Sequence, residues 1–163
     1  MSYLYRLVGI AGLILMGAMA SPVQAATVVK VELWDQGAAA QMATNLAYPV
    51  DQAAHDKATM GIKTSVDAAK AGVVTFQVSN TSKDTVHEMI VVRLDKPNQV
   101  LSYDAKAQTL NEDKIGYIGE VEELNPGKDG TLTKALKAGD YLLICNVAGH
   151  FTAGMWTPFT VTQ

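Results

Sequence analysis

Short runs of alternating apolar and polar residues recur along this chain of 163 residues. Val29, Val31 and Leu33 alternate with polar residues, and the same pattern returns over residues 74–78 and 159–161. A period of two places the apolar side chains on one face of a β-strand. Sequences rich in Gly, Asn, Pro and Asp separate the runs at 71–72, 80–84, 125–130 and 138–140, as turns do. The pattern predicts an all-β fold, built as a β-sandwich.

Two segments do not follow this alternation. Residues 35–58 are rich in Ala, Gln and Met, and we expect them to hold a helical turn or a long loop. We expect residues 95–114 to form a long connection between two strands that contains a short helix. No internal repeat, low-complexity tract or linker divides the chain, so we expect one folded domain.

The N-terminus has the pattern of a secretory signal. Arg6 precedes an apolar stretch from Leu7 to Ala20, and small residues follow up to Ala25. We therefore predict a signal peptide over residues 1–25, cleaved after Ala25, and a mature domain over residues 26–163. We expect this domain to be periplasmic, monomeric and without a membrane span, because nothing after the signal approaches the roughly 20 apolar residues that a span needs.

Net charge and cysteine content limit the classes of function that the chain can have. The formal net charge is −3 and there is no basic run, which argues against nucleic acid as a partner. The single cysteine of an exported chain cannot form an internal disulfide. It is therefore an intermolecular bridge, an inert buried thiol, or a reactive or metal-bound thiolate.

The neighbours of this cysteine favour a metal. Cys145 ends the apolar run that begins at Tyr141, and His150 and Met155 follow within one Gly-containing loop. Thiolate, imidazole and thioether are the ligands of a blue-copper site, which needs one more imidazole. His87 is the candidate, because it lies near the start of a predicted strand whose end can meet Cys145 at one pole of a sandwich.

The strand after His87 does not settle which of its faces is buried. Met89 and Val91 share the face of His87, whereas Ile90 and Val92 make the opposite face equally apolar. The sequence alone therefore leaves open whether His87 reaches Cys145.

The segment 141–155, with His87 upstream and a final strand over 156–161, resembles the cupredoxin (type 1 blue copper) family. The C-x4-H-x4-M spacing is similar to that of rusticyanin and auracyanin, and to small periplasmic cupredoxin-like copper-binding proteins. The resemblance implies a Greek-key β-sandwich holding one type 1 copper ion. It also implies His87 and His150 as equatorial imidazoles, Cys145 as the equatorial thiolate and Met155 as the axial thioether.

One position departs from the family pattern. Many cupredoxins have Asn or Ser after the first ligand histidine, where it ties the two ligand loops together, whereas this chain has Glu88. We predict that the side chain of Asn146 compensates by reaching the His87 loop. Contacts of this kind around the ligands tune a metal site.

The pattern predicts a copper protein and not an enzyme. A Cys/His nucleophile is disfavoured because Cys145 leads into a Gly-containing loop that ends in a methionine. We expect one-electron transfer, copper handling, or both, with a periplasmic cytochrome, an oxidase or copper-handling proteins as partners. The alternatives are a copper tolerance or sequestration protein without a dedicated redox partner, and a sandwich domain that serves as an interaction module.

Other residues near the expected site have two interpretations each. An apolar docking surface around His150 is expected from four residues: Ala148, Phe151, Ala153 and Trp156. His55, with Met42 and Met60, could form an accessory copper site, or His55 could be a solvated loop residue. Trp156 either flanks the copper loop or packs in the core.

Overall fold

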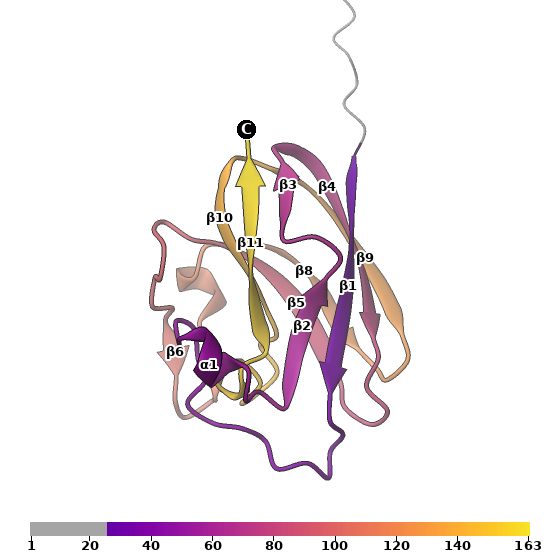
Figure 1. The fold of residues 1–163 in the computed structure, drawn as a ribbon, viewed down its shortest axis with the longest axis vertical. Helices are drawn as coiled ribbons and strands as arrows, with labels where there is room; N and C mark the ends of the chain where they lie inside the picture. Colours follow the sequence, from indigo (N-terminus) through magenta and orange to yellow (C-terminus); the bar gives the residue numbers. More distant parts are fainter. Residues whose placement is uncertain (1–25) are drawn as a thin grey trace, which may run out of the picture.

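The molecule is a sandwich of two β-sheets with irregular segments along one side (Figure 1). The computed structural model describes residues 26–163, and the predicted signal peptide lies outside them. The all-β sandwich expected from the alternating pattern is confirmed.

The first sheet has four strands in the order β2-β1-β4-β9. β1 runs parallel to β4 and antiparallel to β2, and β4 and β9 are antiparallel. The bounds of these strands are Thr27–Asp35 (β1), Met60–Thr64 (β2), Gly72–Asn80 (β4) and Asp129–Leu136 (β9). The alternating run from Val29 to Leu33 is the middle of β1, as predicted.

The second sheet has five strands in the order β3-β11-β10-β5-β8. Its strands are Ala68–Lys70 (β3), His87–Arg93 (β5), Tyr117–Leu124 (β8), Gly139–Ile144 (β10) and Trp156–Thr162 (β11). The chain crosses from β4 to β5, from β8 to β9 and from β9 to β10 between the two sheets. Crossed connections of this kind join the sheets of Greek-key sandwiches.

An apolar core, here called the inner core, fills the space between the two sheets. The alternate residues of β1 and β4 point into it and are almost completely buried. Phe76 from the first sheet meets Phe159 from the second edge to face, with ring centroids 5.5 Å apart. Cys145 and Met155 belong to the same cluster, so two predicted ligands lie at the end of the inner core.

A second apolar cluster, here called the outer core, covers the opposite face of the second sheet. It is made of Ile90, Val92, Leu94, Leu101, Leu110, Ile115, Leu142, Ile144, Phe151 and Trp156. The two irregular segments cover it, with part-buried Ala47, Tyr48 and Val50 packed against it. β5 is therefore apolar on both faces because both are buried, which answers the question that its sequence left open.

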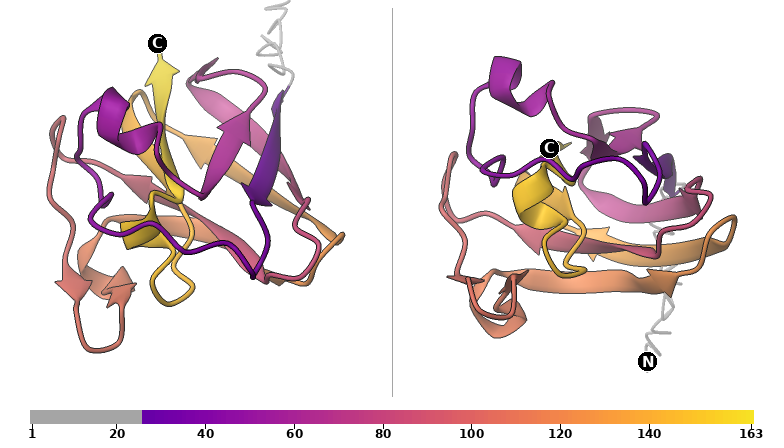
Figure 2. Two further views of the ribbon diagram at one scale, coloured as in Figure 1. Left: turned by 60° about the horizontal axis from the view of Figure 1, so that its bottom comes forward. Right: turned by 90° about the horizontal axis from the view of Figure 1, so that it is seen from below.

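The two irregular segments contain the short helices that the sequence suggested, and a hairpin that it did not. The helix α1 (Gln52–His55) lies in the first segment. The hairpin of β6 (Tyr103–Asp104) and β7 (Thr109–Leu110) lies in the second, together with the 3-10 helix η1 (Glu112–Lys114). Figure 2 shows both segments beside the loop that follows β10. Within residues 26–163, none of the helices has the length and apolar character to cross a membrane.

Candidate metal centre

Cys145 is the first residue after β10 and is completely buried. Its backbone N–H donates to the carbonyl of Met155 at 3.0 Å, which closes the loop 145–155 on itself. The apolar residues of β10 therefore deliver the sulfur to one end of the sandwich, as the sequence predicted.

The loop turns back through two glycines and a short 3-10 helix, η2 (Phe151–Ala153). Gly149 and Gly154 have φ values of +84° and +96°, a conformation that glycine adopts without steric cost. His150 precedes η2, and its carbonyl accepts the N–H of Met155 at 3.0 Å. This geometry directs the imidazole back toward Cys145.

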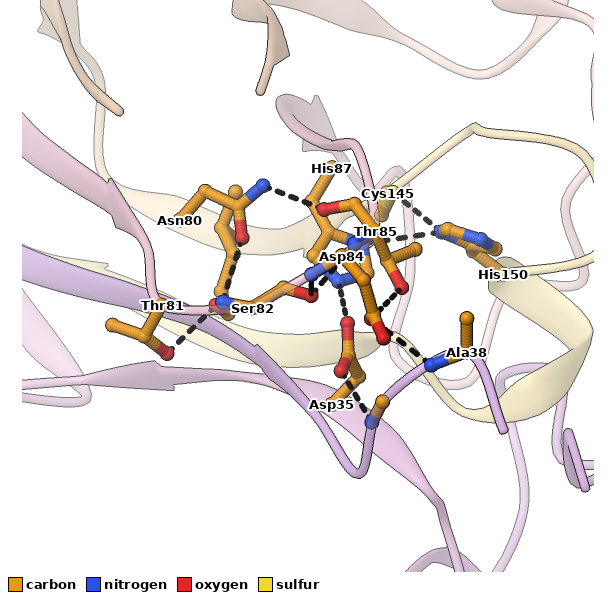
Figure 3. A network of polar contacts seen from close by, with 12 residues as sticks. Asp35, Ala38, Asn80, Thr81, Ser82, Asp84, Thr85, His87, Cys145 and His150 are labelled. Carbon is orange, nitrogen blue, oxygen red and sulfur yellow. Dashed lines mark hydrogen bonds and ion pairs between the residues drawn. The ribbon is translucent and has the colours of Figure 1, made fainter. Parts of the chain in front are cut away.

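His87 completes the cluster from the first residue of β5 (Figure 3). Nδ1 of His87 lies 3.3 Å from Nδ1 of His150. Nδ1 of His150 in turn lies 3.4 Å from Sγ of Cys145. Among residues 26–163, these three make the one group of His, Cys and acidic side chains that can hold a metal, with ligand atoms within 4.8 Å of one another. The structure thus brings together three of the four predicted site residues by their ligand atoms.

Met155, the fourth predicted residue, lies at the opposite end of the same loop. It is 0% exposed and belongs to the inner core with Cys145. The backbone bond between the two residues keeps the main chain of Met155 beside that of Cys145.

The protonation of the three side chains suits a cation. Burial raises the pKa of the Cys145 thiol to about 12. Burial, with the nearby His87, lowers the pKa of His150 to about 4, and burial also lowers the pKa of His87. Near neutral pH the cluster therefore holds a thiol and two neutral imidazoles, and a soft metal can take the lone pairs of the imidazoles and displace the thiol proton.

Two backbone N–H groups assist the loss of that proton. The N–H groups of Glu88 and Val147 donate to the Cys145 sulfur and act to lower its pKa, against the larger effect of burial. Hydrogen bonds to a sulfur stabilise its negative charge. The chemistry of this donor set, two imidazoles and one thiolate in a buried pocket, fits copper.

Comparison with known proteins identifies the family. The family model described as "Sulfocyanin (SoxE) domain" matches residues 68–163, more than half of the chain. This chain belongs to the sulfocyanin family of cupredoxins. The matched residues include β5, β10 and the whole loop 145–155, so the cluster lies within the matched region.

Solved structures show the same fold at low sequence identity. Dithionite-reduced auracyanin from the photosynthetic bacterium Roseiflexus castenholzii is 19% identical, with a TM-score of 0.50 over 85% of this chain and 98% of that one. Auracyanin B is 21% identical (TM-score 0.51, 85% and 90%). Reduced rusticyanin is 16% identical (TM-score 0.52, 85% and 81%). No curated protein matches the chain.

In this cupredoxin, Glu88 itself connects the two ligand segments. Its carboxylate accepts the backbone N–H of Asn146 at 2.9 Å. The prediction that the Asn146 side chain reaches the His87 loop is wrong, because that side chain bonds to the backbone of Leu110 and to Glu112. The Glu88 side chain is long enough to reach from β5 to the backbone of Asn146. The two ligand segments therefore remain connected although Glu replaces the usual Asn or Ser at position 88.

His55 lies outside the cluster and contacts the end of the ligand loop. Its ring stacks on Trp156 at a centroid distance of 3.9 Å, and its Nε2 lies 2.8 Å from the carbonyl of Gly154. The solvated loop position expected for His55 is therefore wrong. Trp156 is 4% exposed and donates from Nε1 to the carbonyl of Leu46, which confirms its packing role.

The apolar docking surface predicted around His150 is also wrong in most of its members. Phe151 and Trp156 are buried under the two irregular segments and Ala153 is buried in the inner core, so only Ala148 is exposed. A cavity of about 250 Å³ opens beside His150 instead, lined also by Asp35, Met42 and Met60. Met42 is 40% exposed and lies next to the position that a Cβ on Gly149 would take.

Asp35 contacts His87 directly, and its sequence context did not predict this. Its Oδ2 lies 2.6 Å from Nε2 of His87. Fifty-two positions separate the two residues, so no local motif joins them. The one available signal was the position of Asp35 at the end of an alternating strand, where it leads into the irregular segment.

Proposed function

We propose that this chain is an exported type 1 copper protein that transfers single electrons. His87 and His150 would bind one copper ion through Nδ1, Cys145 through its thiolate and Met155 through its thioether. The convergence of the three ligand atoms within 4.8 Å in a buried pocket carries the proposal. Bound copper would supply a Cu(II)/Cu(I) couple, which two imidazoles and a thiolate with a weak axial ligand accommodate in both states.

The chain itself keeps the ligands in place. The loop is closed by the bond between Cys145 and Met155, and Glu88 connects it to β5. Packing from both cores restrains it further. Ligands fixed in this way need little rearrangement when an electron arrives or leaves, and fast exchange follows from that.

The proposal also covers the cellular location, the oligomeric state and the redox partner. Residues 1–25 would direct export to the periplasm and be removed, leaving a monomer of residues 26–163. The partner would be a periplasmic cytochrome or an oxidase. His150, 6% exposed and lining the cavity next to Met42, is the ligand best placed for the electron to pass through.

A second candidate is a copper tolerance or sequestration protein without a dedicated redox partner. The position of Met42 favours it, because an exposed thioether at the cavity beside His150 can receive Cu(I) from solvent or from a donor protein. Thioethers are soft ligands that prefer Cu(I). Copper would then pass inward to a site whose redox change is incidental.

Metal loading tests the shared part of both candidates. Cu(II) added to the metal-free chain 26–163 should give an intense visible thiolate-to-copper band that saturates at one copper per chain. Cys145→Ser should abolish the band. His55→Phe is the matched control, because it removes a histidine outside the cluster while keeping an aromatic ring against Trp156, and it should retain the full band. Absence of the band from the unsubstituted chain would contradict both candidates.

Electron exchange separates the two candidates. Mixed with a soluble cytochrome c, a carrier should be oxidised or reduced with a second-order rate constant of about 10⁵ M⁻¹s⁻¹ or more, the usual range for protein encounters. A sequestration protein should exchange electrons far more slowly. Its deletion should instead make the cell sensitive to copper.

A further inference from the structure

Asp35 is held rigidly at the end of β1, beside the cluster (Figure 3). Its side chain is 3% exposed. Oδ1 accepts the backbone N–H of Gly37 at 2.7 Å, while Oδ2 faces Nε2 of His87 at 2.6 Å. Ser82 adds a side-chain hydrogen bond to the same carboxylate. Both oxygens are engaged, so the carboxylate has one orientation.

This contact determines which nitrogen of His87 carries the proton. An ionised carboxylate only accepts hydrogen bonds, so Nε2 must be the protonated nitrogen at this distance. Oδ1 of Asp35 accepts the N–H of Gly37 and Oδ2 faces Nε2 of His87, so both oxygens serve as acceptors. Nδ1 of His87 is then bare, and Nδ1 is the atom that faces His150.

The contact also puts a negative charge behind one ligand of the cluster. A negative charge across an imidazole ring stabilises the more positive oxidation state of a bound metal. At a separation of about 7 Å and an effective dielectric constant of about 20, one unit charge changes the ratio of the Cu(II) and Cu(I) affinities by roughly fiftyfold.

We infer that Asp35 is a positioning residue of the copper centre, which fixes the tautomer and orientation of His87 and favours Cu(II) over Cu(I). The inference rests on the proposed function, since it concerns the same site. Carboxylate partners of metal-bound histidines act in this way in other metal sites. Here the partner comes from β1, in the other sheet, so the contact also ties the first sheet to the ligand cluster.

Asp35→Asn is the sharpest variant. The asparagine has nearly the same shape but only one acceptor oxygen, and the native carboxylate accepts from both Gly37 and His87. The variant therefore loses the charge and leaves one of the two N–H groups facing an NH₂ group. Asp84→Asn is the matched control, because Asp84 bonds to Ala38 and Thr85 in the same region without touching His87.

Two measurements test the inference. Nitrogen-15 NMR of the metal-free protein should find His87 protonated on Nε2 in the unsubstituted chain and in Asp84→Asn, with a mixture of tautomers in Asp35→Asn. In the copper-loaded protein, Asp35→Asn should increase the ratio of Cu(I) to Cu(II) affinity roughly fiftyfold. For a one-electron couple, at 59 mV per tenfold, this raises the reduction potential by about 100 mV. Asp84→Asn should change it much less.

The outcomes are separable. His87 protonated on Nδ1 in the unsubstituted, metal-free chain would overturn the inference even if Asp35→Asn failed to fold. An equal change of potential in the two variants, or none in either, would overturn it as well. If no copper bound at all, the proposed function would fail, and the NMR result would still decide whether Asp35 sets the tautomer.

Discussion

The two faces of the second sheet carry cores of different kinds. The inner core ends at the pole in a polar network, where Cys145 and His87 meet Asp35 from the other sheet. At this end the outer core meets Asn146 instead, whose side chain bonds to the backbone of Leu110 and to Glu112. It holds the back of the ligand loop through Phe151 and Trp156. The inner face therefore supplies the ligand atoms, and the outer face holds in place the loop that carries His150.

This division predicts that some substitutions will change the position of the ligand loop and others the charge of the site, each without the other. Substitutions in the outer core should change how long a metal stays bound without changing its spectrum. Substitutions in the polar network should change the charge and the pH dependence of the site. Three variants and one matched control test the division, in order of the expected change in unfolding free energy.

Trp156→Ala should have the largest effect. It removes a buried aromatic ring and the hydrogen bond to Leu46, and truncations of this kind cost about 3–5 kcal/mol of unfolding free energy. Because Trp156 supports the loop from behind, copper should also dissociate several-fold faster, while the visible band of the bound fraction stays at its original wavelength. Urea unfolding and chelator competition measure the two effects.

Phe76→Ala is the matched control in the inner core. Phe76 is completely buried and packs on Phe159, in the middle of the sandwich, so a similar loss of stability is expected. Copper release should remain close to that of the unsubstituted chain. Equally fast release from both variants would show that the loop depends on overall stability and not on the outer core.

Glu88→Gln should have an intermediate effect that depends on pH. Burial raises the pKa of Glu88 to about 7 from its ordinary value of 4.5. Between these values the unfolded chain has lost the proton while the folded chain keeps it, so stability falls as pH rises through this window. The metal-free chain should lose up to about 2 kcal/mol relative to Glu88→Gln, after allowance for solvent screening.

Urea midpoints of both proteins, measured from pH 4.5 to pH 8, check this prediction. The difference between the two should grow up to about pH 7 and then stay constant. Parallel curves over the whole range would contradict it, because they would mean that Glu88 has the same pKa in the folded and unfolded chains.

His55→Ala should have the smallest effect. It removes the ring stacked on Trp156 and the hydrogen bond to Gly154, and a single hydrogen bond of this kind contributes about 1 kcal/mol. Copper should still bind at one equivalent, with the same spectrum. Loss of a second equivalent of copper would instead support the accessory site suggested for His55, Met42 and Met60.

The sequence predicts the parts of this molecule that depend on neighbouring residues. Alternation identified strands such as β1 and β4, and the run from Tyr141 to Met155 identified the ligand loop. Its folding back through Gly149 and Gly154 followed from the conformational freedom of glycine. These features are local, so one stretch of chain contains all the information.

Contacts between distant segments could not be predicted, because no single stretch of sequence contains the information that determines them. The pairing of Asp35 with His87 depends on the order of strands in two sheets, and the bond from Asn146 to Glu88 depends on where β5 and the loop end. The docking surface was misjudged because residues 46–50 and 94–115 cover Phe151 and Trp156. Nothing in the loop sequence indicates that other segments will cover it.

The proposed ligand set requires that Nδ1 of His87, Nδ1 of His150 and Sγ of Cys145 bind one copper ion. A crystal structure of the copper-loaded chain, with anomalous data collected at the copper edge, tests it most directly. We expect one strong peak bonded to these three atoms, with the Met155 sulfur as a fourth, more distant neighbour. A peak at Met42 or His55 with none between the three atoms, or no peak at all, would contradict the account.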